Sequence, residues 1–311
     1  MRKLEGIIIP CITPFDEEGI LRLDWLKSNF QKWNTTEISG YMVLGSNGEF
    51  RSLSDDEAFH VIQTVSALVP HEKTLIAGVG RESLYHTVRF IKRLEEEKVS
   101  VDYISVLTPC YFKKLMSDEA LIDYYKRIAD ESPYPVLLYC APGFANDLRI
   151  SAKALEVLAE HPNIAGIKDT SADMMDTYMA AVGKREDFQV FAGSLNNILT
   201  CLKKGGKGGI ISVANYFPRT CAEFYRIFRE EGQAQGEAYL DKLKVLAKET
   251  GAKAGVAGVK ALMNLMGYQA GVPRRPVLPC DDMFVRNTEH YIKENRAFIL
   301  DQQDREGSNS E

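Results

Sequence analysis

The sequence predicts an α/β protein with a closed (β/α)₈ barrel, the TIM-barrel fold, followed by a C-terminal helical extension. Between Gly6 and Glu231, eight short apolar segments alternate strictly with eight longer amphipathic segments. The short segments are apolar on both faces, which is typical of strands in a parallel sheet covered by helices. Eight such units in succession favour a sheet that closes into a barrel.

The predicted strands are short runs rich in valine, isoleucine, leucine and aromatic residues. They span residues 6–13, 40–45, 74–80, 102–108, 135–140, 164–168, 188–193 and 208–214. The predicted helices carry apolar residues at a spacing of three to four. They span residues 24–33, 55–69, 83–98, 118–131, 151–160, 173–183, 196–203 and 218–231.

Capping signals support two of the predicted helix starts. Ser54 precedes an acidic first turn, and Glu57 follows three residues later, which is the pattern of a capping box. Ser117 precedes two acidic residues in the same way. We therefore expect helices to begin directly after both serines.

An open, doubly wound α/β sheet is the alternative architecture. Such a sheet normally carries a Gly-x-Gly-x-x-Gly turn after an early strand. The segment "GVGRES" at residues 78–83 is the nearest match, and it lacks that spacing. The barrel is therefore the favoured prediction.

The strand pattern stops near Gly232, and three further helical segments follow near residues 234–249, 255–267 and 283–301. We interpret residues 1–231 as the catalytic barrel and residues 232–311 as an appended helical bundle. The last residues, "DREGSNSE", form a polar tail that we expect to be disordered.

Composition excludes several classes of protein. Hydrophobic residues make up 45% and charged residues 26%, which are globular values. The net charge of −5 gives no basic footprint for a nucleic acid. No apolar run reaches the ~18 residues of a membrane-spanning helix, and Pro10 and Pro14 interrupt the N-terminal run, which argues against a signal peptide. We expect a cytoplasmic protein with neither nucleic-acid nor membrane partners.

The cysteines and histidines show no metal-ligand spacing. The six cysteines are scattered and contain no Cys-x-x-Cys pair, so we expect free thiols. The five histidines are equally dispersed. A metal-dependent enzyme is therefore disfavoured, and we predict no metal site.

Lys168 is the first candidate functional residue, because it ends the apolar strand segment "IAGIK". Catalytic residues of such barrels come from the C-terminal ends of the strands. A buried amine there would have a pKa lowered from ~10.4 toward neutrality and could attack a ketone to form a Schiff base. The alternative is a structural lysine whose ammonium reaches solvent.

Tyr139 ends the preceding strand, so its hydroxyl could lie near that amine and move protons. The alternative is a tyrosine that only packs. After the second strand, "GSNGEF" places Ser46 and Asn47 in a loop whose hydroxyl, amide and backbone N–H groups suit a small carboxylate. The alternative is an ordinary turn of Gly, Ser and Asn.

Five motifs then occur in a fixed order: "GSNGE", "TPCYF", "LLYCAPG", "GIKDTS" and "VFAGS". Together they resemble the dihydrodipicolinate synthase/N-acetylneuraminate lyase family of Schiff-base pyruvate aldolases, from Leu4 to about Leu300. The family's fold, a barrel with a C-terminal helical extension, agrees with the strand and helix pattern.

The resemblance implies that Lys168 is the Schiff-base lysine and Tyr139 the acid/base. It implies that Ser46 and Asn47 hold the carboxylate of a 2-oxo acid, with Ser46 also relaying protons. Tyr111 matches the tyrosine that completes the relay, usually in a neighbouring subunit's site. Gly193 and Ile211 would line the pyruvate site through main-chain groups. A homo-oligomer, either a dimer or a homotetramer, is expected, and no metal or organic cofactor is required.

Within the family, the sequences of these motifs most resemble the 4-hydroxy-2-oxoglutarate aldolase branch. Two departures affect the pocket for the second substrate. Phe144 stands where the synthases carry an arginine that grips a carboxylate. Thr170, Ser171 and Ala172 stand where the aldolase branch has glycines.

The sequence thus predicts a lyase that cleaves a 4-hydroxy-2-oxo acid to pyruvate and an aldehyde. Two enzymatic alternatives use the same imine: condensation of pyruvate with aspartate semialdehyde, and a sugar-acid lyase or dehydratase reaction. The non-enzymatic alternative is a protein that only binds a keto acid, and the joint presence of Lys168, Tyr139, Ser46 and Tyr111 argues against it.

Overall fold

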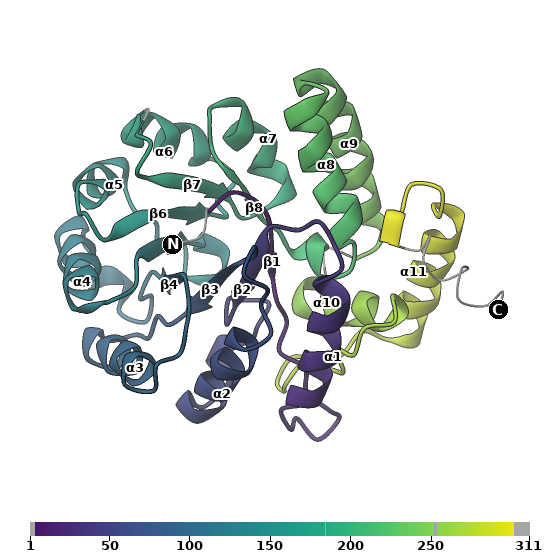
Figure 1. The fold of residues 1–311 in the computed structure, drawn as a ribbon, viewed down its shortest axis with the longest axis horizontal. Helices are drawn as coiled ribbons and strands as arrows, with labels where there is room; N and C mark the ends of the chain where they lie inside the picture. The colour runs from purple at the N-terminus through teal and green to yellow at the C-terminus, as the bar shows by residue number, and fades with distance from the viewer. Residues whose placement is uncertain (1–3, 184, 252–253, 302–311) are drawn as a thin grey trace. The chain divides into compact units, whose positions relative to one another are not determined.

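The fold is a closed barrel of eight parallel strands in the order β1-β2-β3-β4-β5-β6-β7-β8, which confirms the predicted (β/α)₈ class (Figure 1). It is seen in a computed structural model that describes residues 4–183, 185–251 and 254–301. Each strand is followed along the chain by a helix, as the alternation of apolar and amphipathic segments predicts.

The strands are short and fully or almost fully buried, as apolar runs between helices should be. They are β1 (Gly6–Pro10), β2 (Gly40–Val43), β3 (Thr74–Gly78), β4 (Tyr103–Leu107), β5 (Val136–Cys140), β6 (Ile164–Asp169), β7 (Gln189–Ala192) and β8 (Gly208–Ile210).

Helices follow the strands and continue beyond the last of them. They are α1 (Leu23–Trp33), α2 (Asp55–Ser66), α3 (Leu84–Glu96), α4 (Asp118–Glu131), α5 (Ala152–Ala159), α6 (Met175–Val182), α7 (Leu195–Lys203), α8 (Pro218–Glu230), α9 (Gln233–Glu249), α10 (Gly255–Leu265) and α11 (Asp282–Glu294). Among the described residues, short 3₁₀ helices lie in loops, including η1 (Phe50–Ser52), η2 (Lys113–Leu115), η3 (Pro142–Phe144) and η4 (Ser212–Asn215).

Both predicted helix caps are confirmed. The Ser54 side chain accepts from the Glu57 backbone N–H at 3.2 Å, and a Glu57 carboxylate oxygen accepts from the Ser54 N–H at 2.9 Å. Ser117 accepts from the Ala120 N–H at 3.2 Å. Each cap satisfies backbone donors that the first helical turn leaves without an intrahelical partner.

The chain forms two compact units, residues 1–6 with 74–211 and residues 7–73 with 212–311. The first unit contains β3–β8 and α3–α7. The second contains nearly all of β1, together with β2, α1, α2 and α8–α11. The expected division of the chain into a catalytic barrel of residues 1–231 and a bundle of residues 232–311 stays an expectation.

Strand register in the first unit decides which side chains are neighbours. Tyr139 of β5 lies opposite Lys168 of β6, and Cys140 lies opposite Asp169. On the other side of β6, Lys168 lies opposite Phe191 of β7. The C-terminal ends of β5, β6 and β7 are therefore in register, which makes Tyr139, Lys168 and Phe191 neighbours across the sheet.

Several predicted elements end earlier in the structure than the sequence suggests, including β1, which ends at Pro10 and not at residue 13, and α2, which ends at Ser66 and not at residue 69. β8 ends at Ile210 and not at residue 214, because η4 follows it. In that turn the Asn215 amide donates to the carbonyls of Pro10 and Ser212 at 2.9 and 3.0 Å, so a side chain replaces strand hydrogen bonds. α10 ends at Leu265 and α11 at Glu294, short of the predicted ends at 267 and 301.

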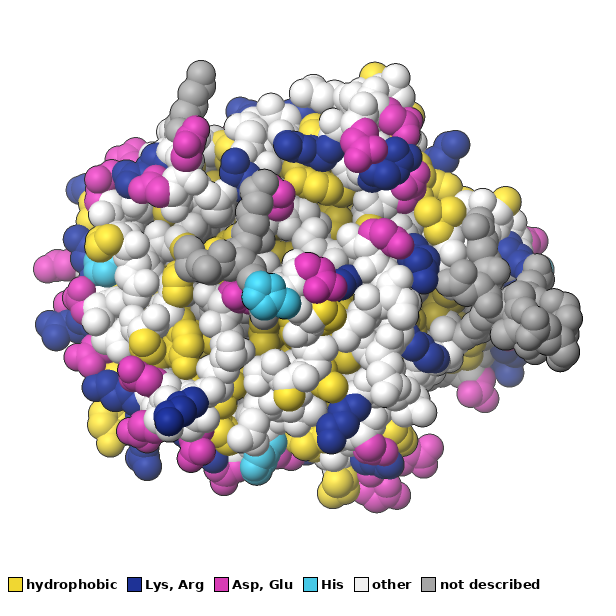
Figure 2. All heavy atoms as spheres, in the orientation of Figure 1, with side chains coloured by type: hydrophobic (Ala, Val, Ile, Leu, Met, Phe, Trp, Pro, Cys, Tyr) yellow, Lys and Arg dark blue, Asp and Glu magenta, His cyan; other side chains and the backbone are white. Residues whose placement is uncertain are grey.

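The six cysteines are free thiols, as predicted. The predicted polar tail, residues 304–311, lies outside the described residues. Among the residues that the structure describes, none of the helices is both long and apolar enough to cross a membrane. Figure 2 shows basic and acidic side chains interspersed on the face in view, in keeping with the chain's 38 basic and 43 acidic residues.

Candidate active site

Lys168 lies near the end of β6 and is only 3% exposed. Its Nζ is placed over the ring of Tyr139, 4.2 Å from the ring centroid. Removal of the amine from water disfavours the ammonium, and this desolvation lowers the pKa of Lys168 to about 7. Near neutral pH a large share of the side chain is therefore a free amine, the nucleophilic form.

Local sequence explains this burial. Lys168 follows Ile164-Ala-Gly-Ile, and its register partners are Tyr139 and Phe191, which are both buried. An ammonium over an aromatic face gains a modest cation–π attraction. Desolvation by burial is the cause that lowers the pKa of Lys168. The predicted alternative of a solvent-reaching structural lysine is therefore wrong.

Asp169, the residue after the lysine, holds the loop that follows β6. Its carboxylate accepts from the Ser171 backbone N–H at 3.0 Å and from the Ser171 hydroxyl at 2.7 Å. Burial raises the pKa of Asp169 to about 6. The Asn197 side chain of α7 donates to the carbonyls of Asp169 and Ser171 at 2.9 and 3.2 Å. The loops after β6 and β7 are thereby tied together.

Thr170 and Gly193 meet at the ends of these two strands. The Thr170 hydroxyl donates to the Cys140 carbonyl at 3.2 Å. A Cβ on Gly193 would lie 2.1 Å from the Thr170 methyl carbon and 2.9 Å from the Asp169 carbonyl oxygen. No side chain fits at position 193, so only main-chain atoms of this residue are available at the ends of β6 and β7. The Gly193 N–H donates to Asp169 at 2.6 Å.

Two other predicted residues are exposed within the first unit. Tyr111 is 77% exposed, and its N–H donates to the Glu82 carboxylate at 3.0 Å, which fixes the backbone while the ring points outward. Phe144 lies in η3 and is 62% exposed. Arg149, the nearest cation along the chain, forms a salt bridge with Asp173.

The loop after β2 carries the predicted carboxylate-binding residues in the second unit. Ser46 and Asn47 are half-buried, and the Asn47 amide donates to the Ser212 hydroxyl at 2.7 Å. The Thr13 hydroxyl donates to the Gly48 carbonyl at 2.7 Å. A Cβ on Gly48 would lie 2.9 Å from the Leu44 nitrogen, so the tight turn requires glycine. Ile211, which directly follows β8 in the first unit, is fully buried.

Sequence reasoning missed two residues that organise these loops, Asn197 and Ser212. Asn197 sits three residues after Ser194 and completes a capping box at the start of α7. That spacing is visible in the sequence and could have been noticed. Ser212 offered no signal, because its segment reads as a strand.

The described part of the chain contains no group of three or more histidine, cysteine, aspartate or glutamate side chains that could hold a metal ion. The chemistry that this part of the chain offers is an amine of lowered pKa beside a buried phenol.

Comparison with known proteins identifies the family. The sequence model of the dihydrodipicolinate synthetase family matches residues 3–295. A probable mitochondrial 4-hydroxy-2-oxoglutarate aldolase of Emericella nidulans is 32% identical over 282 residues, which cover 87% of this chain and 88% of that protein. A 4-hydroxy-tetrahydrodipicolinate synthase of Acetivibrio thermocellus is 31% identical over 291 residues, which cover 93% and 96%.

Solved structures agree with the fold and the family. The dihydrodipicolinate synthase of Thermotoga maritima has a TM-score of 0.86 and 25% identity, covering 94% of this chain and 98% of that one. The family match confirms the resemblance predicted from the five ordered motifs, and the relatives' names include both an aldolase and a synthase. The chain belongs to the dihydrodipicolinate synthetase family and is a lyase of the aldolase type.

Proposed function

We propose that this chain is a Schiff-base aldolase that cleaves a 4-hydroxy-2-oxo acid, similar to 4-hydroxy-2-oxoglutarate, to pyruvate and an aldehyde. The observation that carries the proposal is the buried amine of Lys168, with its pKa lowered to about 7 and the Tyr139 ring 4.2 Å away. A neutral amine at working pH is what imine formation with a ketone requires.

The proposed reaction begins when Lys168 Nζ attacks the C2 ketone and water leaves, giving a protonated imine. The phenol of Tyr139 supplies the proton with which water leaves, and the resulting phenolate takes the proton of the C4 hydroxyl. The phenol so regenerated is the source of the proton that the enamine later takes. The C3–C4 bond breaks, the aldehyde departs, and its bonding electrons enter the imine to give an enamine. The enamine takes a proton at C3, and hydrolysis of the resulting imine releases pyruvate and the free amine of Lys168.

The other predicted residues take roles that rest on the family resemblance. Ser46 and Asn47 bind the substrate carboxylate, Ser46 also relays protons, and main-chain groups of Gly193 and Ile211 line the pyruvate site. Phe144 and Thr170 border the aldehyde half of the substrate. The pyruvate moiety is common to the proposed substrate and to those of the alternative reactions. Imine chemistry on Lys168 requires no metal or organic cofactor.

Tyr111 is proposed to complete the proton relay in a neighbouring subunit of a homo-oligomer, a dimer or a tetramer. It is 77% exposed, and Phe112 and Leu115 beside it are also exposed large hydrophobic residues. An apolar group of this kind on a loop whose backbone is fixed by Glu82 suits a second copy of the chain.

Imine formation should depend on pH through Lys168. Since only the free amine attacks, the rate of pyruvate trapping by borohydride should rise with pH and level off above about 7, the pKa that burial gives this group. An ordinary exposed lysine would instead give a rate still rising near pH 10. Mass spectrometry of the reduced adduct across a pH series measures the midpoint, and a midpoint near 10 would contradict the assignment.

The preference for an aldolase substrate rests on Phe144. A synthase needs a cation for the carboxylate of aspartate semialdehyde, and a charged bidentate contact contributes ~1.5–3 kcal/mol. Phe144 offers an apolar wall, and Arg149 is already paired with Asp173. We therefore expect kcat/KM for condensation of pyruvate with aspartate semialdehyde to be lower than for cleavage of a 4-hydroxy-2-oxo acid.

Steady-state kinetics on both substrates decides between the two reactions, with pyruvate release and pyruvate consumption as readouts. Phe144→Arg is expected to raise the condensation reaction, whereas the matched variant Phe144→Leu should not. If the unmodified chain condenses aspartate semialdehyde with a higher kcat/KM than it cleaves any 4-hydroxy-2-oxo acid, the synthase reading replaces the aldolase reading.

A further inference from the structure

A buried ion pair joins the loop after β2 to helix α10. The Glu49 Oε1 and Lys260 Nζ atoms are 2.6 Å apart, in residues that are 8% and 1% exposed. Lys260 interrupts the apolar stretch "GVAGVKALMNL" of α10. Burying two charges is costly unless each is held by the other and by further polar contacts, so the surroundings of both groups matter.

Glu49 belongs to the same turn as Ser46 and Asn47. Its N–H donates to the Ser46 carbonyl at 3.1 Å, and its backbone is in the left-handed region with φ of 49°. For a residue other than glycine this backbone conformation is strained, and it persists only when other contacts hold the residue in place. Its Oε2 accepts from the Arg274 N–H at 2.9 Å.

Lys260 reaches Glu49 from the C-terminal segment. Its Nζ also donates to the Val272 carbonyl at 2.8 Å and lies over the Phe15 ring, 4.4 Å from the centroid. Burial lowers the pKa of Lys260 to about 8, against the opposing effect of Glu49. The ammonium thus has two polar contacts, an ion pair with the Glu49 carboxylate and a hydrogen bond to the Val272 carbonyl.

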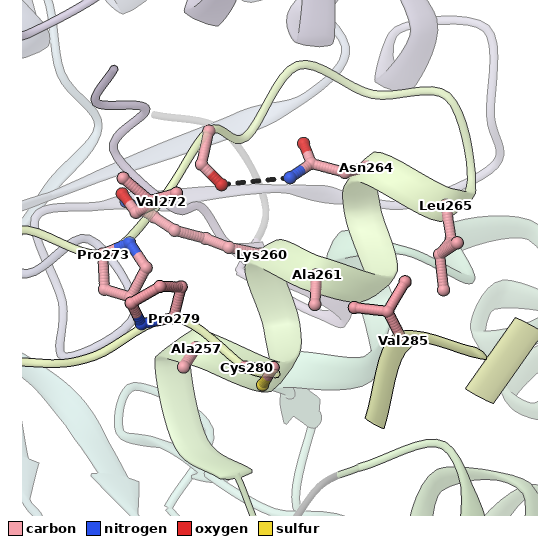
Figure 3. Close-up of a pocket in the computed structure, with 11 residues that line it drawn as sticks. Ala257, Lys260, Ala261, Asn264, Leu265, Val272, Pro273, Pro279, Cys280 and Val285 are labelled. Atoms are coloured by element: carbon pink, nitrogen blue, oxygen red, sulfur yellow. Dashed lines mark hydrogen bonds between the residues drawn. The ribbon is translucent and has the colours of Figure 1, made fainter. Parts of the chain in front are cut away.

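Figure 3 shows the Lys260 side chain running from α10 toward Val272 and Pro273. It borders a cavity of about 330 Å³ whose other lining residues include Ala257 and Ala261. The side chain remains 1% exposed, and its contacts with Glu49 and the Val272 carbonyl hold the ammonium inside the protein. Methionine is unbranched, flexible and close to lysine in length, so Lys260→Met should keep most of the packing of the stem.

We propose that the Glu49–Lys260 pair positions the Ser46–Asn47 turn for the substrate carboxylate. Helix α10 then contributes to substrate binding indirectly, through Lys260. The inference rests on the proposed function, in which Ser46 and Asn47 bind that carboxylate. Glu49 and Lys260 are positioning residues: loss of either charge leaves the other buried and unpaired, and the turn rearranges to hydrate it. A displacement of about 1 Å is enough to weaken a binding site.

The test compares Lys260→Met, Glu49→Gln and the double variant that carries both changes. Lys73→Met is the matched control, because Lys73 is another buried lysine of the same unit whose Nζ donates to backbone carbonyls, including that of Ile38 at 3.0 Å. Thermal unfolding is measured for each. Activity is measured as KM and kcat, and borohydride trapping at Lys168 is measured with pyruvate and with hydroxyacetone, a ketone that lacks the carboxylate.

We expect both single variants to raise KM about tenfold or more while kcat stays within about threefold, the signature of lost uniform binding. The pyruvate concentration needed for trapping should rise in parallel, and hydroxyacetone trapping should be unchanged. Lys73→Met should lower the unfolding temperature and keep KM unchanged. If a single variant does not fold, the double variant, which leaves no unpaired charge, decides the question.

Wild-type KM in the folded Lys260→Met and Glu49→Gln proteins, or equal losses with pyruvate and hydroxyacetone, would overturn the proposal. Failure of the proposed Schiff-base chemistry looks different, because the unmodified chain would then not be trapped by pyruvate at all, and a synthase in place of an aldolase would still be trapped.

Discussion

Lys168→Ala is expected to abolish turnover and to remove the covalent adduct that pyruvate and borohydride leave on the chain. The variant lacks the nitrogen that forms the imine, and no side chain on the described strands β5 and β7 beside it offers a second amine. Intact-protein and peptide mass spectrometry should place the adduct of the unmodified chain at Lys168.

Lys203→Ala is the matched control, since Lys203 is a lysine at the end of α7 in the same unit. It should keep both the adduct and the activity. An adduct of unchanged amount in Lys168→Ala would show that another amine carries the chemistry, and the assignment of Lys168 would then be wrong.

Tyr139→Phe is expected to bind pyruvate and form the imine but to lose ~10²–10⁴-fold in kcat, the usual contribution of a positioned acid or base. The phenyl ring keeps its packing in a position that is 3% exposed, so the fold should survive. Steady-state kinetics, trapping by borohydride and circular dichroism measure the three properties separately.

The pH midpoint of trapping distinguishes two causes of lost activity in Tyr139→Phe: the loss of a proton shuttle and a change in the pKa of the Lys168 amine. Desolvation, and not the phenol, lowers the pKa of Lys168, so the midpoint should stay near 7 in Tyr139→Phe. Near-wild-type turnover in the folded variant would leave Tyr139 as a packing residue, the alternative that the sequence also allows.

Much of the site within the first unit could be predicted because it depends on neighbours in the chain. Tyr139 and Lys168 end consecutive strands, and parallel strands in a barrel bring such ends side by side. The strand order of the barrel follows the order of the segments for the same reason. The close approach of Gly193 to Thr170 required coordinates, since neither residue reveals the other's position.

The Glu49–Lys260 pair could not be predicted from periodicity or spacing. The two residues lie 211 positions apart, and neither strand nor helix period relates them. One signal was present: Lys260 is the one charged residue of α10 (Gly255–Leu265), and a charged side chain on a largely apolar helix needs a buried partner. The sequence does not say which of the 43 acidic residues that partner is.

The burial of Lys168 also has a thermodynamic consequence for the whole chain. Its pKa is about 7 when folded and near 10.4 when unfolded. Between these values the unfolded chain binds more protons, so the free energy of unfolding rises with pH across that window. Below pH 7 both states are charged and the full cost remains, about 1.4 kcal/mol for each unit of pKa difference. The fold tolerates this residue at the expense of its own stability, as expected where selection acts on reactivity.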